Sequence, residues 1–146
     1  MDKCLFCMIA NKEIPSNTVY EDDLIYVFHD IDPQAPVHVL MVPKKHISST
    51  ETVQEEDAML VAHMMLKLKE LTALLGLENG YRVVMNYGED GLQTVPHLHM
   101  HILGKRKLTC RLELRFLFTV QSANRTFGSG TSSSESIKKI DRKSVV

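Results

Sequence analysis

Three histidines alternate with apolar residues at the centre of this chain, at positions 97, 99 and 101, and the apolar character continues to Gly104. Successive side chains of a β-strand point to opposite faces of its sheet, so this pattern predicts a strand with all three imidazoles on one face. Imidazole titrates near neutral pH, is nucleophilic when neutral and binds metals. We therefore interpret the segment as a half-buried strand that carries a functional site. The alternative is a solvated polar face, which usually mixes residue types.

The segments around this strand predict an α+β fold with a mainly antiparallel sheet. Further strands are expected at residues 18–21, 24–28, 38–43 and 81–85. The nearly all-apolar segment 38–43 is expected at a central position, because a strand that is covered on both faces needs apolar residues on both.

Two helices complete the expected fold. A short N-terminal helix is predicted over residues 4–11, with Leu5, Met8 and Ile9 on its apolar side. The Thr52-Val53-Gln54-Glu55 pattern resembles a capping box and predicts the start of one long helix that ends at Gly76. The apolar positions that follow helical spacing are Leu60, Met64, Leu68, Leu71 and Leu75.

Length and charge exclude several classes of protein. The chain has 146 residues, with 17 Lys and Arg against 18 Asp and Glu, so it suits one domain and has no basic excess for nucleic acid. No apolar run approaches the roughly 20 residues of a membrane span, and the N-terminus is too polar for a signal peptide. The three cysteines do not form a disulfide framework. We expect a cytoplasmic protein without nucleic-acid or membrane partners.

The composition changes after about Lys107. Residues 122–146 are rich in Ser, Gly and Lys, which is typical of disorder. We therefore predict a domain over residues 1–108 and a disordered tail over residues 109–146.

Several segments between residues 3 and 108 together form a specific pattern. They are Tyr20-Glu21-Asp22, Phe28-His29-Asp30-Ile31, Pro33-Gln34-Ala35-Pro36-Val37-His38, Val42-Pro43-Lys44-Lys45-His46-Ile47-Ser48, Gly80-Tyr81-Arg82-Val83-Val84, Asn86, Asp90-Gly91, Gln93 and His97 through Gly104. In this pattern the chain resembles the histidine triad family of nucleotide-binding proteins, and most closely its small phosphoramidases. The resemblance implies the fold described above and cleavage of purine nucleoside 5′-phosphoramidates.

The resemblance also implies catalytic roles. His99 would attack the α-phosphorus and carry a nucleotidyl group, and water would then release the nucleoside monophosphate. His101 and His38 would hold phosphate oxygens and manage protons, with His97 in a supporting role. Thr94 would contact the phosphate and the leaving group. No cofactor is required for this chemistry.

The expected substrate is a purine nucleotide of the AMP type. Asp30 would accept hydrogen bonds from the ribose hydroxyls, and Asn86, Thr94, Gln93 and His101 would lie along the phosphate. The residues expected around the base are Leu5, Phe6, Ile9, Phe28, His29 and Ile31. The resemblance further implies a homodimer, formed through the long helix and the adjacent sheet edge.

Other functions stay open at this stage. A close enzymatic alternative is hydrolysis of dinucleoside polyphosphates. A second is a nucleotide-binding adaptor with little turnover. A third is a metal-binding module that uses the three histidines themselves, which would leave Asp30, Asn86 and Thr94 unexplained.

Cys4-Leu5-Phe6-Cys7 is a separate candidate metal site, because a Cys-x₂-Cys pair is half of a zinc site. As in zinc-containing members of the family, His46 and His97 are the candidates for the other half. The alternative is a pair of buried free cysteines in a helix.

The chain also departs from the family pattern. Thr94 stands where many relatives have Ser, and Leu92 where many have Gly, which puts the fit of the 86–94 loop to phosphate in doubt. Relatives usually end in Trp-Pro-Pro-Gly, whereas this chain has no Trp and reads Cys110-Arg111-Leu112-Glu113. Deleting one G from TGG CCG CCT GGA gives codons for Cys-Arg-Leu-Glu, so a frameshift from Cys110 onward is one hypothesis and a lineage-specific extension is the other.

Overall fold

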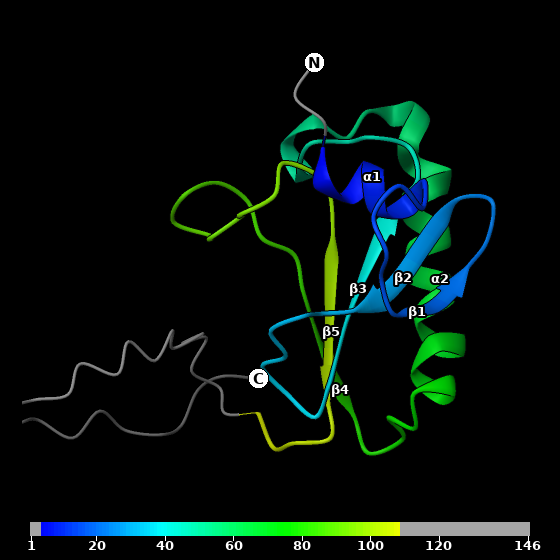
Figure 1. Ribbon diagram of the computed structural model, residues 1–146, viewed down its shortest axis with the longest axis vertical. Coiled ribbons are helices and arrows are strands. Elements are labelled where there is room, and N and C mark those ends of the chain that lie inside the picture. The colour runs from blue at the N-terminus through cyan, green and yellow to red at the C-terminus, as the bar shows by residue number, and fades with distance from the viewer. Residues whose placement is uncertain (1–3, 109–146) are drawn as a thin grey trace, which may run out of the picture. The chain divides into compact units, whose positions relative to one another are not determined.

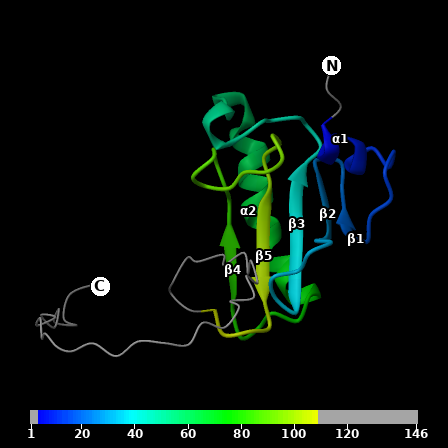
Figure 2. The same ribbon diagram turned by 60° about the vertical axis from the view of Figure 1, so that its left-hand side comes forward.

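A five-stranded antiparallel sheet forms the centre of residues 4–108, the part of the chain that the computed structural model describes. The strand order is β1-β2-β3-β5-β4, as Figure 2 shows. The elements are α1 (Leu5–Ala10), β1 (Thr18–Glu21), β2 (Ile25–His29), β3 (Val37–Pro43), two 3₁₀ helices (Thr50–Thr52 and Glu55–Asp57), α2 (Ala58–Leu74), β4 (Tyr81–Val84) and β5 (Met100–Gly104) (Figure 1). The predicted α+β class is confirmed. The predictions for the tail and for Cys110 lie outside the described residues.

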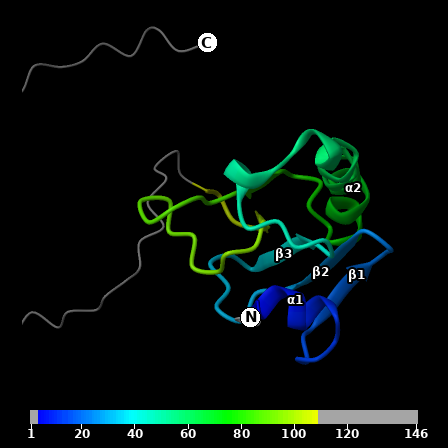
Figure 3. The same ribbon diagram turned by 90° about the horizontal axis from the view of Figure 1, so that it is seen from above.

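The two helices cover opposite faces of the sheet (Figure 3). Ile25 and Val27 of β2 belong to the core on the α2 face, whereas Tyr26 and Phe28 pack with α1. Strand β3 divides its side chains in the same way and lies in the middle of the sheet. The central position predicted for the all-apolar segment is therefore confirmed, since both of its faces exclude water.

Helix α2 begins at Ala58, so the predicted start at Thr52 is wrong. The Thr52 hydroxyl instead bonds the backbone of Ser49, at 3.1 Å from both its N–H and its carbonyl oxygen. The Asp57 carboxylate accepts from the Gln54 N–H at 3.0 Å and receives Lys45 Nζ at 2.6 Å. The polar residues that the sequence pattern predicted as a single helix cap thus form two short 3₁₀ helices before α2. Its end agrees with the prediction, because Gly76 adopts a positive φ of 65°.

The short helix α1 exists as predicted, but its buried face differs. Phe6, Ile9 and Ala10 are buried. Leu5, which was expected on the apolar side, is 42% exposed. Of the two residues between the cysteines, Phe6 is the buried one, and it packs in a cluster with Tyr26 and Phe28 of β2. This orientation matters for the site described below.

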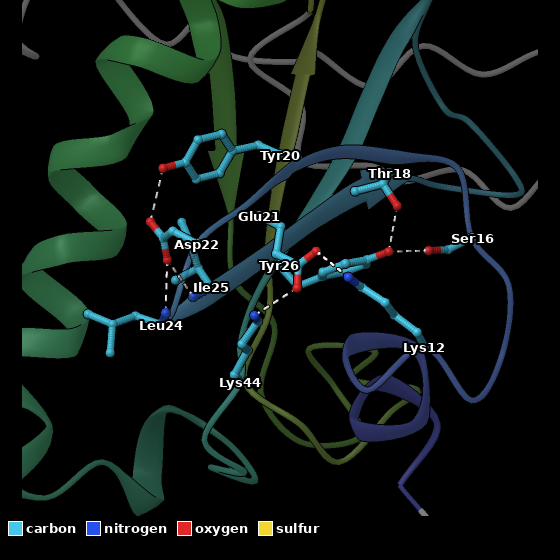
Figure 4. Close-up of polar contacts among 10 residues, drawn as sticks. All are labelled: Lys12, Ser16, Thr18, Tyr20, Glu21, Asp22, Leu24, Ile25, Tyr26 and Lys44. Carbon is cyan, nitrogen blue, oxygen red and sulfur yellow. Dashed lines mark hydrogen bonds and ion pairs between the residues drawn. The ribbon is translucent and has the colours of Figure 1, made fainter.

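The β1–β2 hairpin is closed around Asp22 (Figure 4). Its Oδ1 accepts from the N–H groups of Leu24 and Ile25, both at 2.9 Å, and its Oδ2 accepts from Tyr20 at 3.1 Å. His63 of α2 lies 2.7 Å from Oδ2. Although burial opposes ionisation, these hydrogen bonds, led by that of His63, lower the pKa of Asp22 to about 2. His63 therefore ties the helix to the hairpin and lies outside the histidine cluster.

Strand β5 begins at Met100, so the strand predicted from His97 is shorter than expected. Leu98 donates its N–H to Ile47 O at 2.6 Å, outside the sheet ladder. The predicted division of faces nevertheless holds: Leu98, Met100 and Ile102 lie in the core on the α2 face, and the rings of His97 and His99 contact Phe6 on the α1 face. Within residues 4–108, no helix combines the length and apolar character needed to cross a membrane.

Candidate active site

His99 is held in one orientation by the backbone next to it. Its Nδ1 lies 2.7 Å from the carbonyl oxygen of His97. Because a carbonyl oxygen can only accept, Nδ1 carries the hydrogen, and the neutral ring keeps its lone pair on Nε2. The ring meets that of Phe6 edge-on, with centroids 5.2 Å apart. The result is a buried imidazole with a fixed tautomer, which is the form that acts as a nucleophile.

His38 and His101 form a hydrogen-bonded pair whose tautomers are set by the main chain. The Gln34 N–H donates to His38 Nδ1 at 3.1 Å, so neutral His38 carries its hydrogen on Nε2. That nitrogen lies 2.9 Å from His101 Nδ1. His101 accepts there and carries its own hydrogen on Nε2. The Gln34 N–H thus leaves Nε2 of His101 as a hydrogen-bond donor.

Both members of this pair are neutral at pH 7. Burial lowers the pKa of His38, and burial together with the neighbouring His99 and His38 lowers the pKa of His101 to about 4. The rings of His99 and His101 lie 5.0 Å apart in a T-shaped arrangement. A nucleophilic nitrogen therefore stands beside a neutral N–H donor, an arrangement that suits attack on phosphorus with a hydrogen bond to its oxygens.

Asp30 lies at the edge of this pair. Its Oδ2 is 3.4 Å from His38 Nε2, and its Oδ1 accepts the Asp32 N–H at 2.8 Å. The turn therefore fixes the half-buried carboxylate beside the histidines. The structure brings Asp30, His38, His99 and His101 together, as the sequence predicted.

His97 faces a different set of residues. It is fully buried, and its Nε2 donates to Pro43 O at 2.9 Å, which leaves the lone pair on Nδ1. Burial lowers the pKa of His97, which keeps the ring neutral. Nδ1 lies 3.3 Å from Cys4 Sγ and 3.4 Å from Cys7 Sγ. The three alternating histidines thus belong to two sites, and the carbonyl oxygen of His97 connects them through its contact with His99 Nδ1.

Cys4, Cys7, His46 and His97 form a compact cluster of donor atoms, all within 4.8 Å of one another. His46 Nδ1 lies 3.3 Å from both Cys7 Sγ and His97 Nδ1. Tetrahedral zinc with bonds of about 2.0 Å to nitrogen and 2.3 Å to sulfur requires donor separations of about 3.3–3.8 Å. The Pro43 carbonyl also fixes the His97 tautomer in the way that zinc-bound histidines commonly show. The residues present therefore fit zinc.

The residues expected around the base are only partly brought together. Phe6, Ile9 and Phe28 share one buried cluster, in which the rings of Phe6 and Phe28 meet edge-on at 5.7 Å. His29 is half-buried at the end of β2. Leu5 and Ile31 lie at the surface, and Ile31 is fully exposed. The described structure thus offers an aromatic wall next to His99 and two exposed apolar side chains beyond it.

The 86–94 loop closes on itself. Leu92 donates its N–H to Glu89 O and Gln93 donates to Gly88 O, both at 3.0 Å, so both amides already have acceptors within the loop. The side-chain nitrogen of Gln93 bonds the carbonyl oxygens of Ser48 and Val95. Asn86 is half-buried and Thr94 is exposed.

Leu92 has a φ of 55°, a left-handed conformation that costs a non-glycine residue about 1–2 kcal/mol. This conformation explains why a leucine is less favourable at position 92 than the glycine of many relatives. Its neighbour Gly91 is required, because an added Cβ would lie 2.2 Å from Tyr87 O. The loop keeps its shape at an energetic cost that glycine at position 92 would avoid.

Sequence reasoning missed the main-chain groups that orient the histidines. These groups are the Gln34 N–H and the carbonyl oxygens of Pro43 and His97. Every residue carries such groups, so no residue type indicates them. The only available signal was the position of Gln34 and Pro43 within the conspicuous segments 33–38 and 42–48.

Comparison with known proteins finds related sequences and structures. The family model described as HIT domain matches residues 11–108. Protein HitA from Neisseria gonorrhoeae is 47% identical over 104 residues, which cover 71% of this chain and 97% of that protein. The crystal structure of a HIT family hydrolase from Legionella pneumophila superposes with a TM-score of 0.73 at 46% identity, covering 75% of this chain and 98% of that one. A histidine triad protein from Clostridium difficile gives a TM-score of 0.71 at 44% identity, covering 75% and 97%.

Proposed function

This chain belongs to the HIT domain family, and we propose that it is a hydrolase of purine nucleoside 5′-phosphoramidates that works through a nucleotidyl-His99 intermediate. The observation that carries the proposal is the fixed tautomer of His99, with Nδ1 bonded to His97 O and Nε2 left as the nucleophile beside His101. The Legionella relative is called a hydrolase, which supports the reaction class.

In the first step, Nε2 of His99 attacks the α-phosphorus and forms a P–N bond. The bond to the substrate nitrogen breaks, and that nitrogen keeps the electron pair and takes a proton from solvent as it leaves as an amine. His101 donates a hydrogen bond to a phosphoryl oxygen, whose negative charge grows in the transition state. We assign the Thr94 hydroxyl to a contact with the same phosphate and with the leaving group.

In the second step, water attacks the phosphorus and the P–Nε2 bond of His99 breaks. The nucleoside monophosphate leaves, and the proton of the water passes to solvent through the site. The neutral pair of His38 and His101 supports both steps, because burial lowers the pKa values of both rings and so avoids a positive charge that would repel the cationic ring of nucleotidyl-His99. No metal or organic cofactor takes part in either step.

The buried aromatic pair of Phe6 and Phe28 supports a purine nucleotide as the substrate. An apolar, aromatic wall binds a planar base through its faces and edges. Asp30 lies where the chain leaves β2 and is assigned to the ribose hydroxyls. This arrangement also accommodates the competing substrate class, the dinucleoside polyphosphates, so the two must be compared directly.

Wild-type protein is expected to cleave an adenosine 5′-phosphoramidate with a kcat/KM at least about tenfold above that for a diadenosine polyphosphate. The amine leaving group of a phosphoramidate needs no second nucleotide subsite. A diadenosine polyphosphate needs such a subsite to bind its second nucleotide. Initial rates on both substrates, measured at equal enzyme concentration, check this. Preference for the polyphosphate would contradict the proposed substrate class, and AMP binding without cleavage of either substrate would favour the adaptor.

We also propose a structural zinc ion held by Cys4, Cys7, His46 and His97. The donor separations support it, and the two cysteines come from the α1 segment while the histidines follow β3 and precede β5. Burial and the neighbouring Cys4 raise the pKa of Cys7 to about 11, so the metal-free thiol is protonated. Zinc would displace that proton and tie the N-terminal segment to the sheet.

A homodimer is the third part of the proposal. Helix α2 carries exposed apolar side chains along one side, and Met59 and Leu66 are 80% and 78% exposed. The neighbouring strand β4 is an edge strand of the sheet and carries the exposed Tyr81. Exposed apolar residues beside an unpaired strand edge favour association with a second copy.

Leu66→Asp is expected to convert the dimer to a monomer, because it places a charge in an apolar interface at a cost of several kcal/mol. Analytical ultracentrifugation at micromolar concentration measures the change. Leu5→Asp is the matched control, since Leu5 is an exposed leucine of α1, which covers the opposite face of the sheet from α2 (Figure 3). A wild type that sediments as a monomer, or a Leu66 variant that stays dimeric, would overturn this interface.

A further inference from the structure

The side chain of Gln93 bridges two parts of the chain that are far apart in sequence. Its Nε2 lies 2.7 Å from Ser48 O and 3.1 Å from Val95 O. Both partners are carbonyl oxygens, which only accept, so the amide must present its nitrogen to them. An amide nitrogen has two hydrogens, and these two contacts use both. Gln93 therefore has no remaining N–H for a substrate.

The segment that Gln93 reaches is itself attached to the histidines. Ile47, next to Ser48, accepts the N–H of Leu98 at 2.6 Å. Residues 93 and 98 are thus both bonded to the 47–48 segment. The short stretch between them contains Thr94, and the stretch is followed directly by His99. Two hydrogen bonds, one from the Gln93 side chain and one from the Leu98 N–H, therefore hold the two ends of this stretch.

Val95 adds a second connection. Its side chain packs against the cluster of Phe6 and Phe28, while its carbonyl oxygen accepts from Gln93. The loop upstream closes through its own amides, at Leu92 and Gln93. The Gln93 side chain therefore joins this closed loop to the rest of the site.

We propose that Gln93 is a positioning residue, whose side-chain amide fixes Thr94 beside His99 and does not bind the substrate. This inference rests on the proposed function, because it assigns Thr94 to the phosphate and leaving group. It replaces the direct substrate contact that the sequence pattern predicted for Gln93. Gln93 would act on the reaction only through the hydroxyl of its neighbour.

Gln93→Met, which keeps the length of the side chain and removes both donors, is expected to lower kcat about 10- to 100-fold with little change in KM. In a Thr94→Ala background the same substitution is expected to change kcat less than about twofold, because its effect passes through Thr94. Gln54→Met is the matched control, since the nitrogen of the Gln54 amide bonds the nearby Thr52 O, at 3.2 Å and in an exposed position.

Hydrogen exchange of the 93–98 segment provides a second measurement that does not depend on turnover. Gln93→Met is expected to accelerate exchange of the Leu98 amide at least about tenfold, and Gln54→Met is expected to leave it unchanged. Independent effects of Gln93→Met and Thr94→Ala on kcat, a rise in KM alone, or unchanged exchange would each overturn the proposal. If wild type cleaves no phosphoramidate, the proposed function fails, and the exchange result still decides whether Gln93 fixes the segment.

Discussion

His99→Ala is expected to lower kcat for an adenosine 5′-phosphoramidate by about 10⁴- to 10⁶-fold, because it removes the nucleophile and with it the covalent route. AMP binding is expected to persist, since Phe6, Phe28 and Asp30 are unchanged. Single-turnover rates measure the loss. Mass spectrometry of quenched wild-type enzyme should also show a nucleotidyl adduct on the peptide that contains His99, and this adduct should be absent from the variant.

His99 is buried against Phe6 and His101, so its truncation also removes packing. His99→Asn addresses this, because its side-chain amide can still donate to His97 O while it offers no nucleophilic nitrogen. We expect a folded and equally inactive protein. His63→Ala is the control: it breaks the contact with Asp22 and lowers stability without loss of kcat. Substantial turnover by both His99 variants would exclude the covalent mechanism.

Removal of the proposed zinc has the second largest expected effect. Purified protein should hold one zinc ion per chain, and Cys7→Ser should lose it and reduce the free energy of unfolding by at least about 4 kcal/mol. Wild type treated with a strong chelator should show a similar loss. Metal content by mass spectrometry and chemical denaturation measure the two effects, and neither requires turnover.

His46 offers a sharper comparison, because its side chain is exposed and its removal leaves little cavity. His46→Ala should weaken zinc binding, whereas His63→Ala should leave the zinc content unchanged. Metal-free wild type with full stability would show that the four donors are only hydrogen-bonded to one another. That result would leave the assignment of His99 intact, since His99 contributes no atom to the cluster.

The sequence predicted those parts of the fold in which apolar residues report burial directly. Strands β2 and β3 are apolar on successive residues because α1 and α2 cover both faces of the sheet. The start of α2 could not be read in the same way. Thr52 and Asp57 are both good capping residues, and only the contacts with Ser49 and Lys45 decide which of them precedes the helix.

The same limit applies to the candidate site. Alternation correctly placed His97 and His99 on one face of the sheet, but it could not show that the two rings serve different clusters. That division depends on Pro43 O and on the cysteines of a segment some ninety residues away. Gln93 is the clearest example: the pattern identified the residue, and only its two carbonyl partners indicate what its side chain does.

The bond from the Gln34 N–H to His38 has a consequence for how this site can vary in evolution. The donor is a main-chain group, so nineteen amino acids could occupy position 34 and still supply it, and only proline would delete it. Comparison of sequences at this position would therefore reveal no selection for the N–H itself, even though the direction of the hydrogen bond between His38 and His101 depends on it. The shape of the loop therefore determines which nitrogens of His38 and His101 carry hydrogen. The identities of the loop residues indicate this only indirectly.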